Sequence, residues 1–417
     1  MTVTTDTATT GRPQRGLLPP GAPSEPSGGN WIRERVQRLR TGDFGPLPVI
    51  LGLIVISLVF QLANGRFLSP QNLSNLSLQI ASTGVIALGI VFVLIIGEID
   101  LSAGSVSGLT SATMVVLSIN HGWPPVLAII LAVVFGAAIG LFHGFIFTKL
   151  GVPSFVLTLG GLLAWQGGQL LVLGNQGTIN IPYDGTIASL ANTTLPAWIG
   201  YPIALLYAAV SFGRAFLGTR RRRERGLTVR PLTGTLVPAS VITLVILAAT
   251  AVFQQWHGIP LSLIIFVGLV VIVDVLLRGT TFGRKLFAVG GNAEAARRAG
   301  IQVGTVKVVA FTIASSLAAF GGVLAASRLF AVNQASGGSD ILLNAIAAAV
   351  IGGTSLFGGR GTAYSALLGM LVIGAVSNGM DLLNQTSAVK YVITGAVLVV
   401  AVVIDSLARR GRAASGR

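Results

Sequence analysis

Long apolar stretches dominate this chain and restrict what it can fold into. A helix crosses the hydrocarbon core of a bilayer with about 20 mostly apolar residues. Only helices and closed barrels satisfy every backbone hydrogen bond in lipid. We therefore predict an all-α fold, a polytopic integral membrane helical bundle of about twelve spans. The apolar segments are 47–63, 79–97, 101–119, 125–148, 152–174, 199–217, 236–256, 260–277, 306–330, 340–357, 363–383 and 389–405.

Composition favours a membrane protein over a soluble one. Charged residues make up 10% of the chain and the mean hydropathy is +0.80, whereas an ordinary soluble domain carries roughly 25% charged residues. The formal net charge is +15, but the arginines stand in short clusters between apolar runs. That pattern is typical of orientation signals rather than of a nucleic-acid surface.

Several kinds of chemistry are excluded or disfavoured. The chain has no cysteine, which excludes disulfides and thiolate chemistry. His121, His143 and His257 have no metal-ligand spacing, and no phosphate-binding loop of the GxxxxGK[ST] type occurs. No catalytic nucleophile constellation appears either. We expect a non-enzymatic protein that binds no metal, no cofactor and no nucleic acid directly, and that takes its energy from an ion gradient or a partner.

Loop charges give one consistent orientation. If the N-terminus is cytoplasmic, alternation places Lys149, Arg220–Arg225, the interval 278–305 and Arg360 on the same side. Loops on the opposite side carry almost no Lys or Arg, as the positive-inside rule requires. We predict a multi-pass protein of the plasma membrane with both termini cytoplasmic.

The predicted organisation is one membrane domain with two tails. Residues 1–45, rich in Thr, Pro, Gly and Ser, read as a disordered cytoplasmic tail. The transmembrane domain covers 46–405, and 406–417 form a second cytoplasmic tail. An arginine-rich cytoplasmic loop at 218–235 joins two spans that can be removed without inverting the rest. They are interpreted as an insertion into a ten-span core, with the arginines as a topology anchor near anionic lipid or as a regulatory element.

A weak internal repeat links the two halves. The stretch IGEIDLSAG at 96–104 shares Ile, Gly, Leu and Gly with IGGTSLFGG at 351–359 at the same spacing. Repeats that meet at broken, Gly-rich apolar segments are typical of transporters.

One charged interval, 278–305, ends in a short helix with complete end signals. Asn292 is the predicted N-cap, Glu294 lies in the first turn, Arg297 and Arg298 lie in the last, and Gly300 closes the helix. A helix this short is unstable alone in water. We therefore expect it to dock, and it is a candidate contact for another protein.

Polar residues within apolar segments are candidates for a solute path. Glu98 and Asp100 lie in a Gly- and Ser-rich break, where they either line a path or brace the fold, with Asp100 capping the next helix. The GxxxGxxxG ridge of Gly136, Gly140 and Gly144 predicts close helix packing, and its neighbour His143 is expected to bond across a helix contact.

Further candidates could line a path for a hydroxylated solute, because amides bind hydroxyls and aromatic rings stack on sugar CH surfaces. Hydrogen bonding between helices explains each of them equally well. They are Trp165, Gln166, Gln169, Asn344, Ser377 and Asn378.

These motifs resemble those of the permease subunits of bacterial ATP-binding cassette (ABC) importers for monosaccharides, the ribose and xylose class. The matching stretches lie at 97–109, 151–161, 280–301 and 343–362, and together with 378–383 they extend the resemblance over most of 60–405. The inserted span pair resembles the longer permeases of the xylose type.

The resemblance implies a bacterial plasma-membrane importer with several subunits. It implies a second permease copy, cytoplasmic ATPase subunits that use ATP, and an extracytoplasmic sugar-binding protein. ABC permeases seat a Glu-Ala-Ala, three residues, Gly loop in the ATPase, and Glu294, Ala295, Ala296 and Gly300 match that spacing. The Ile-x-Leu-Pro that often follows is missing.

We therefore expect a permease subunit of an ABC importer for a monosaccharide, xylose in the first place. Asn292, Glu294–Arg298 and Gly300 are the predicted ATPase contact. The predicted substrate path holds Glu98, Asp100, Trp165, Gln166, Asn344 and Asn378. The alternative is an ion-coupled secondary sugar transporter that uses Glu98 and Asp100 as its relay.

Overall fold

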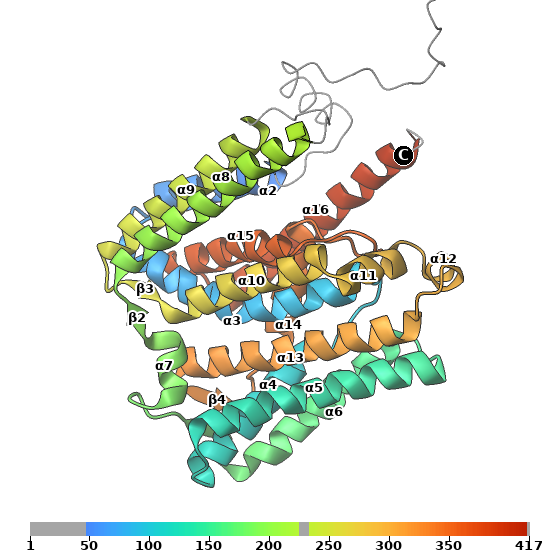
Figure 1. Cartoon of the computed structure of the whole chain (residues 1–417). Coiled ribbons are helices and arrows are strands. Elements are labelled where there is room, and N and C mark those ends of the chain that lie inside the picture. Colours follow the sequence, from blue (N-terminus) through green and yellow to red (C-terminus); the bar gives the residue numbers. More distant parts are fainter. Residues whose placement is uncertain (1–46, 225–232, 415–417) are drawn as a thin grey trace, which may run out of the picture.

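The computed structural model describes residues 47–224 and 233–414, which form a bundle of long helices lying side by side (Figure 1). Helices α11 and α12 lie at one end of the bundle, while α7 and the short strands lie at the other. The predicted tail 1–45 lies outside the described residues. The helices are α2 (Leu47–Ala63), α3 (Pro70–Ile95), α4 (Ala103–Val115), α5 (Pro125–Leu150), α6 (Ser154–Leu173), α7 (Thr186–Asn192), α8 (Gly200–Glu224), α9 (Thr233–Gln254), α10 (Leu261–Gly279), α11 (Thr281–Gly291), α12 (Ala293–Arg298), α13 (Val303–Leu329), α14 (Ser339–Ile351), α15 (Ala363–Leu382) and α16 (Ser387–Ala414).

The predicted all-α membrane fold is confirmed. Each of the twelve apolar segments coincides with part of a helix, and within the described residues eight helices are long and apolar enough to cross a membrane. The strands form two small antiparallel sheets at the α7 end, and a π-helical turn (Val116–Asn120) extends α4. In one sheet β1 (Thr178–Asn180) pairs with β4 (Ala331–Asn333), and in the other β2 (Thr194–Leu195) pairs with β3 (Ile259–Pro260).

Helix α3 begins nine residues before the predicted apolar segment. Ser69 caps it by accepting a hydrogen bond from the backbone N–H of Asn72, and Pro70 occupies the first helical position, where a missing N–H costs nothing. Amide side chains lower the hydropathy of this first stretch, so the apolar pattern did not indicate that it is helical. Asn72 is buried and Asn75 is exposed, and both line a cavity described below.

The core is built on α3 and α13, against which α5 packs closely. A Cβ added to Gly140 would lie 2.8 Å from Thr312 Cα, and one on Gly144 would lie 2.7 Å from Val308 Cα. All three ridge glycines are buried. The predicted close packing of the glycine ridge is therefore confirmed, with α13 as its partner.

Alanine at Gly140 is expected to lower the melting temperature of the detergent-purified protein by several degrees, because the new methyl group meets α13 backbone that must shift. Gly160 on α6 is the matched control, since a Cβ there meets nothing within 4 Å. Gly160→Ala should be neutral or stabilising by about 0.5–1 kcal/mol, the usual helix preference for alanine over glycine. Equal melting shifts in both variants would refute the close packing.

Two helices begin inside the bundle rather than at its ends. After β4, residues 334–338 run inward to α4, so that a Cβ on Gly104 would lie 2.8 Å from the carbonyl oxygen of Gly337. Helix α14 then starts at Ser339, beside the first turns of α4. Non-helical backbone at membrane depth is tolerated only where protein or a cavity surrounds it. These helix starts therefore mark an internal polar region.

The two stretches of the sequence repeat lie together at the α11 end. The first separates α3 from α4, and the second separates α14 from α15. Gly359 N–H donates to the carbonyl of Ile95 at 2.8 Å, and Gly290 of α11 lies against both. The Gly-rich breaks thus join the ends of α3 and α14 to the segment that carries α12.

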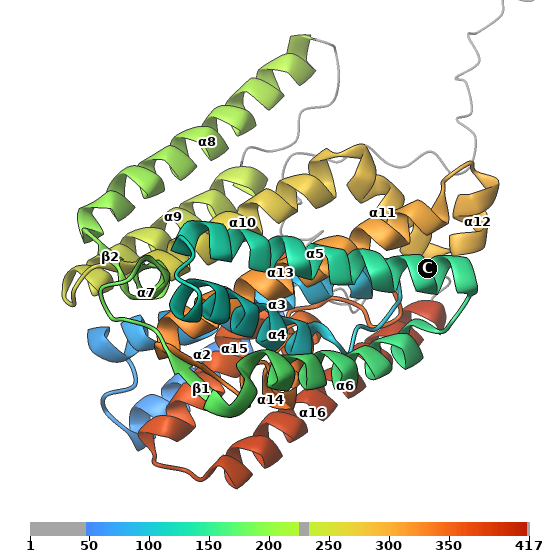
Figure 2. The same cartoon turned by 90° about the horizontal axis from the view of Figure 1, so that it is seen from below.

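Helices α8 and α9 pack on each other at the margin of the bundle (Figures 1 and 2). Helix α8 buries only Gly200 and Ala204 among its residues. It continues to Glu224, with an Arg220–Glu224 ion pair of 2.9 Å, so the first part of the expected 218–235 loop is helical. A run of arginines is compatible with helix because Arg has high helix propensity. Residues 225–232 lie outside the described residues.

Candidate functional site

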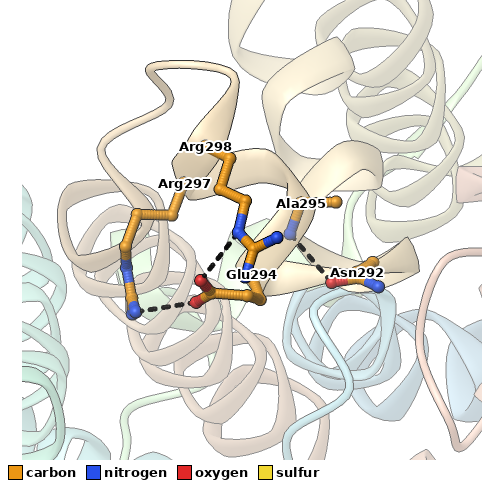
Figure 3. A network of polar contacts seen from close by, with 5 residues as sticks. All are labelled: Asn292, Glu294, Ala295, Arg297 and Arg298. Carbon is orange, nitrogen blue, oxygen red and sulfur yellow. Dashed lines mark hydrogen bonds and ion pairs between the residues drawn. The ribbon is translucent and has the colours of Figure 1, made fainter.

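The short helix α12 has the end structure that its sequence predicts (Figure 3). Asn292 Oδ1 accepts a hydrogen bond from the backbone N–H of Ala295 at 2.9 Å. Glu294 pairs with Arg297 at 3.1 Å and with Arg298 at 3.2 Å. Gly300 follows with a φ of +82°, a conformation that glycine adopts without strain.

Helix α12 is attached to the bundle by a small inner face. Ala296 is buried, and its carbonyl accepts a hydrogen bond from the N–H of Ile301 at 3.0 Å. The three charged side chains stay more than half exposed. Beside them is a groove between α11 and α13, lined by Phe282, Lys285 and Gln302 among others. The end of the bundle thus presents a capped, charged and largely exposed helix.

Helix α11 is an element that the sequence analysis missed. Its N-cap is Thr280, whose hydroxyl oxygen accepts from the N–H of Gly283 at 3.1 Å. The signal was a threonine followed by a mixed apolar and basic run, which could have been recognised. Gly290 near its end fits closely against Ile95. Helix α11 therefore fixes the position from which α12 projects.

Glu98 links two helices near the same end. One carboxylate oxygen of Glu98 accepts from Lys307 Nζ of α13 at 2.7 Å, and the other accepts from the Ser154 hydroxyl of α6 at 2.6 Å. The side chains of Glu98 and Lys307 are each 18% exposed. Lys307 Nζ also lies 4.5 Å from the ring centroid of Phe147 on α5. Glu98 is therefore an internal tie between α13 and α6.

Asp100 belongs to a second, more deeply buried cluster. Its Oδ1 accepts from the N–H of Ser102 at 2.8 Å and from the Ser102 hydroxyl at 2.6 Å, directly before α4. The Ser102 hydroxyl lies 3.4 Å from His143 Nδ1, and Trp165 Nε1 donates to His143 Nε2 at 3.1 Å. His143 thus bonds across a helix contact, as predicted. This chain of contacts connects α4, α5 and α6.

A small polar cavity lies where α4 and α14 begin. Gln166 of α6 faces it together with Ser105 and Gln334. Gln169, also on its lining, is buried and donates to the carbonyls of Asn333 and Ser336 at 2.8 and 3.0 Å. That explains a glutamine in an apolar helix, because the non-helical segment 334–338 needs donors for its carbonyls.

The remaining candidates lie elsewhere. Asn378 is buried near the opposite end of the bundle, where Asn72 Nδ2 donates to its Oδ1 at 2.7 Å. Asn344 is half-buried on α14 and lines neither this region nor the Gln166 cavity. The structure thus brings Glu98, Asp100 and Trp165 together with Gln166 nearby on α6. Asn378 lies near the opposite end of the bundle, and Asn344 lines neither cavity.

The side chains that bind Glu98 were not predicted from the sequence, because they lie far from it along the chain. Lys307 is 209 residues from Glu98, and Ser154 is 56 residues from it. A lysine in the first turns of an apolar helix was the available signal, since a cation there needs a counter-charge. Among the described residues, no group of three or more His, Asp or Glu is placed to hold a metal ion.

Polar clusters inside a many-span helical bundle are typical of transport proteins. Over residues 72–402 the chain matches the permease family described as "Branched-chain amino acid transport system / permease component". That range is most of its length, and the chain belongs to this family.

Individual relatives match over nearly their whole length. The chain is 35% identical to the xylose transport system permease protein XylH of Escherichia coli K12 over 363 residues, 87% of this chain and 92% of the relative. It is 34% identical to XylH of Haemophilus influenzae, covering 86% and 95%. Identity to the ribose import permease protein RbsC of Bacillus subtilis is also 34%, covering 87% and 94%. No solved structure matches the chain. The resemblance to the ribose and xylose class is confirmed.

Proposed function

We propose that this chain is the membrane subunit of an ABC importer that moves a monosaccharide, xylose in the first place, across the plasma membrane. The observation that best supports this proposal is the match to xylose permeases along most of the chain. In this proposal separate ATPase subunits hydrolyse ATP, and an extracytoplasmic binding protein delivers the sugar. Two permease copies, or a closely related pair, form the path in a lipid bilayer.

The ATPase contact is assigned to α12. Its capped ends, buried Ala296 and exposed Glu294, Arg297 and Arg298 make a rigid charged projection. A rigid helix transmits a push without bending. The orientation with α12 and both termini in the cytoplasm rests on the distribution of basic loops.

Motion of α12 would reach α6 through Glu98. Helix α13 starts five residues after α12 ends, and Lys307 in its second turn is paired with Glu98, which in turn is bonded to Ser154 at the start of α6. Helix α6 carries Gln166 and Gln169, which line the cavity between α4 and α14. A displacement of α6 would therefore change access to that polar region.

The rival ion-coupled mechanism needs a carboxylate that exchanges ions during transport. Glu98 instead has both oxygens engaged, by Lys307 and by Ser154. Asp100 uses Oδ1 to brace the start of α4, while its Oδ2 is buried without a hydrogen-bond partner among the described residues. The contacts of Glu98 support a structural and coupling role for that carboxylate, and the proposal leaves sugar contacts to Gln166 and its neighbours.

Substrate class is tested by uptake in cells that lack their own pentose transporters and express this chain with its ATPase and binding protein. We expect uptake of labelled xylose that excess unlabelled xylose abolishes and that excess leucine leaves unchanged. Ribose competition measures how closely the two pentoses share the system. Uptake of labelled leucine in place of xylose would overturn the sugar assignment and favour the amino acid class in the family description.

A further inference from the structure

A second polar cavity opens at the end of the bundle opposite α12. It lies between the first turns of α3 and the last turns of α13 and α15, next to the end of α7. Its volume of about 380 Å³ falls within the roughly 300–1,000 Å³ of small-molecule sites. None of its lining residues is shared with the Gln166 cavity. It is a separate place in the molecule.

Side-chain amides from two helices form one wall. Asn378 Oδ1 accepts from Asn72 Nδ2 at 2.7 Å, and Asn378 Nδ2 lies 3.5 Å from Gln79 Oε1. Asn72 and Asn378 are almost completely buried, and Asn75 lies exposed on the same lining. Bonding between the buried amides fixes their orientation, so the wall presents amide groups in a preset arrangement.

Charged groups of both signs form the other wall. Arg328 lines the cavity, and within the described part of the chain its Nε is buried without a hydrogen-bond partner. Asp381 faces the same space and is ion-paired with Lys390. A buried N–H without an acceptor is energetically unfavourable. Arg328 therefore has donor capacity left for an oxygen of a ligand in the cavity.

The hydrogen-bond donors and acceptors on the cavity lining indicate which class of ligand fits it. Amides offer donors and acceptors together, Arg328 offers donors only, and Asp381 offers acceptors only. A free carboxylate or phosphate would pair with Arg328 but would offer no donor to the acceptor oxygens of the amides and of Asp381, and an apolar molecule would leave the amides unpaired. A neutral polyol satisfies all of them, because each hydroxyl both donates and accepts.

We propose that this cavity is a monosaccharide-binding site at the mouth of the permease opposite α12, distinct from the Gln166 cavity. The inference rests on the proposed sugar function. It assigns Arg328, Gln79 and Asn75 as ligand contacts, and Asn72 and Asn378 as residues that position the amide wall. Sugar released by the binding protein would meet this site before the interior of the bundle.

The natural absence of cysteine permits a direct test, because one introduced thiol reports alone. Leu78 lines the cavity and contributes no polar group, so Leu78→Cys keeps every proposed contact. Leu68→Cys is the matched control, at the same end of the bundle but outside the lining. The rate of thiol modification is measured on the purified permease in nanodiscs, with and without xylose or ribose at millimolar concentration.

We expect sugar to slow modification at position 78 several-fold and to leave position 68 unchanged. Adding Arg328→Gln should abolish the protection, whereas Arg328→Lys should keep part of it; the circular dichroism spectrum checks that both variants are folded. Absence of protection at position 78, equal protection at 68, or protection by acetate and phosphate but not by sugars would overturn the proposal.

Measuring sugar uptake by the complete transporter distinguishes the proposed sugar-binding cavity from the proposed import function. If ATP-driven xylose uptake occurs without protection at position 78, the cavity is not a sugar site and the function stands. If protection occurs without any sugar uptake, the site binds polyols and the proposed transport function fails.

Discussion

Replacing Glu294 with lysine is expected to reduce ATP-driven uptake by about tenfold or more while the amount of permease in the membrane stays the same. Removing one partner of a hydrogen-bonded charge pair that is buried in a protein contact costs about 2–5 kcal/mol of binding, and about 1.4 kcal/mol already corresponds to tenfold. Uptake of labelled sugar and immunoblotting of membranes measure the two quantities.

Folding of α12 should survive this substitution. Glu294 is 56% exposed in both of its ion pairs, and exposed pairs contribute only about 0.2–1 kcal/mol each. The N-cap bond from Ala295 to Asn292 also remains. A loss of uptake would therefore report a lost contact rather than an unfolded helix.

Glu224→Lys is the matched control. Glu224 is a similarly exposed carboxylate, 58% exposed, that pairs with an arginine four residues away on α8. It lies on the peripheral helix pair, in the expected cytoplasmic region. We predict unchanged uptake for this variant. If both variants transport normally, α12 is not the ATPase contact, and if both fail equally, the effect is one of general charge.

Replacing Lys307 with methionine is expected to uncouple transport from ATP hydrolysis. The substitution leaves Glu98 charged in a largely buried place with only Ser154 as its partner. Breaking a fully buried pair costs about 3–5 kcal/mol, and partial exposure here should reduce the cost to about 1–3 kcal/mol by the same reasoning. We predict a normal ATPase rate and at least a several-fold fall in sugar molecules moved per ATP.

Exchanging the charges of Glu98 and Lys307 tests whether this ion pair couples transport to ATP hydrolysis or only stabilises the fold. In the double variant Glu98→Lys with Lys307→Glu the pair is re-formed, and the new lysine can donate to the Ser154 hydroxyl. Transport per ATP should recover in part, because the contact with Phe147 is not restored. Lys149→Met, an exposed lysine at the end of α5, is the control and should change nothing. Equal transport per ATP in all four proteins would refute the tie between α13 and α6.

Local signals in the sequence were enough to predict α12 residue by residue. Its N-cap, first-turn acid, last-turn bases and closing glycine act within a few residues of each other, so the sequence alone contains the relevant physics. The glycine ridge of α5 was likewise predictable, since a face of small residues requires a close partner.

Long-range pairings were not predictable from one sequence. Nothing near Glu98 indicates Lys307, and nothing near Asn378 indicates Asn72, 306 residues away. The starts of α4 and α14 were predicted to within about two residues, but their position inside the bundle was not, because hydropathy does not report where a helix begins in the fold. The proposed path residues, grouped by type in the sequence, therefore do not form one cluster: Asn378 lies near the opposite end of the bundle from Glu98, and Asn344 lines neither cavity.

The source of energy is measured most directly in proteoliposomes that contain this permease, its ATPase subunits and the sugar-binding protein. We predict xylose accumulation that requires ATP, that vanadate blocks and that persists after an ionophore collapses every ion gradient. Glu294→Lys should reduce this accumulation by about tenfold or more, as argued above. Accumulation driven by a proton or sodium gradient in liposomes that contain the permease alone, without nucleotide, would contradict the proposal that ATP hydrolysis by partner subunits drives transport.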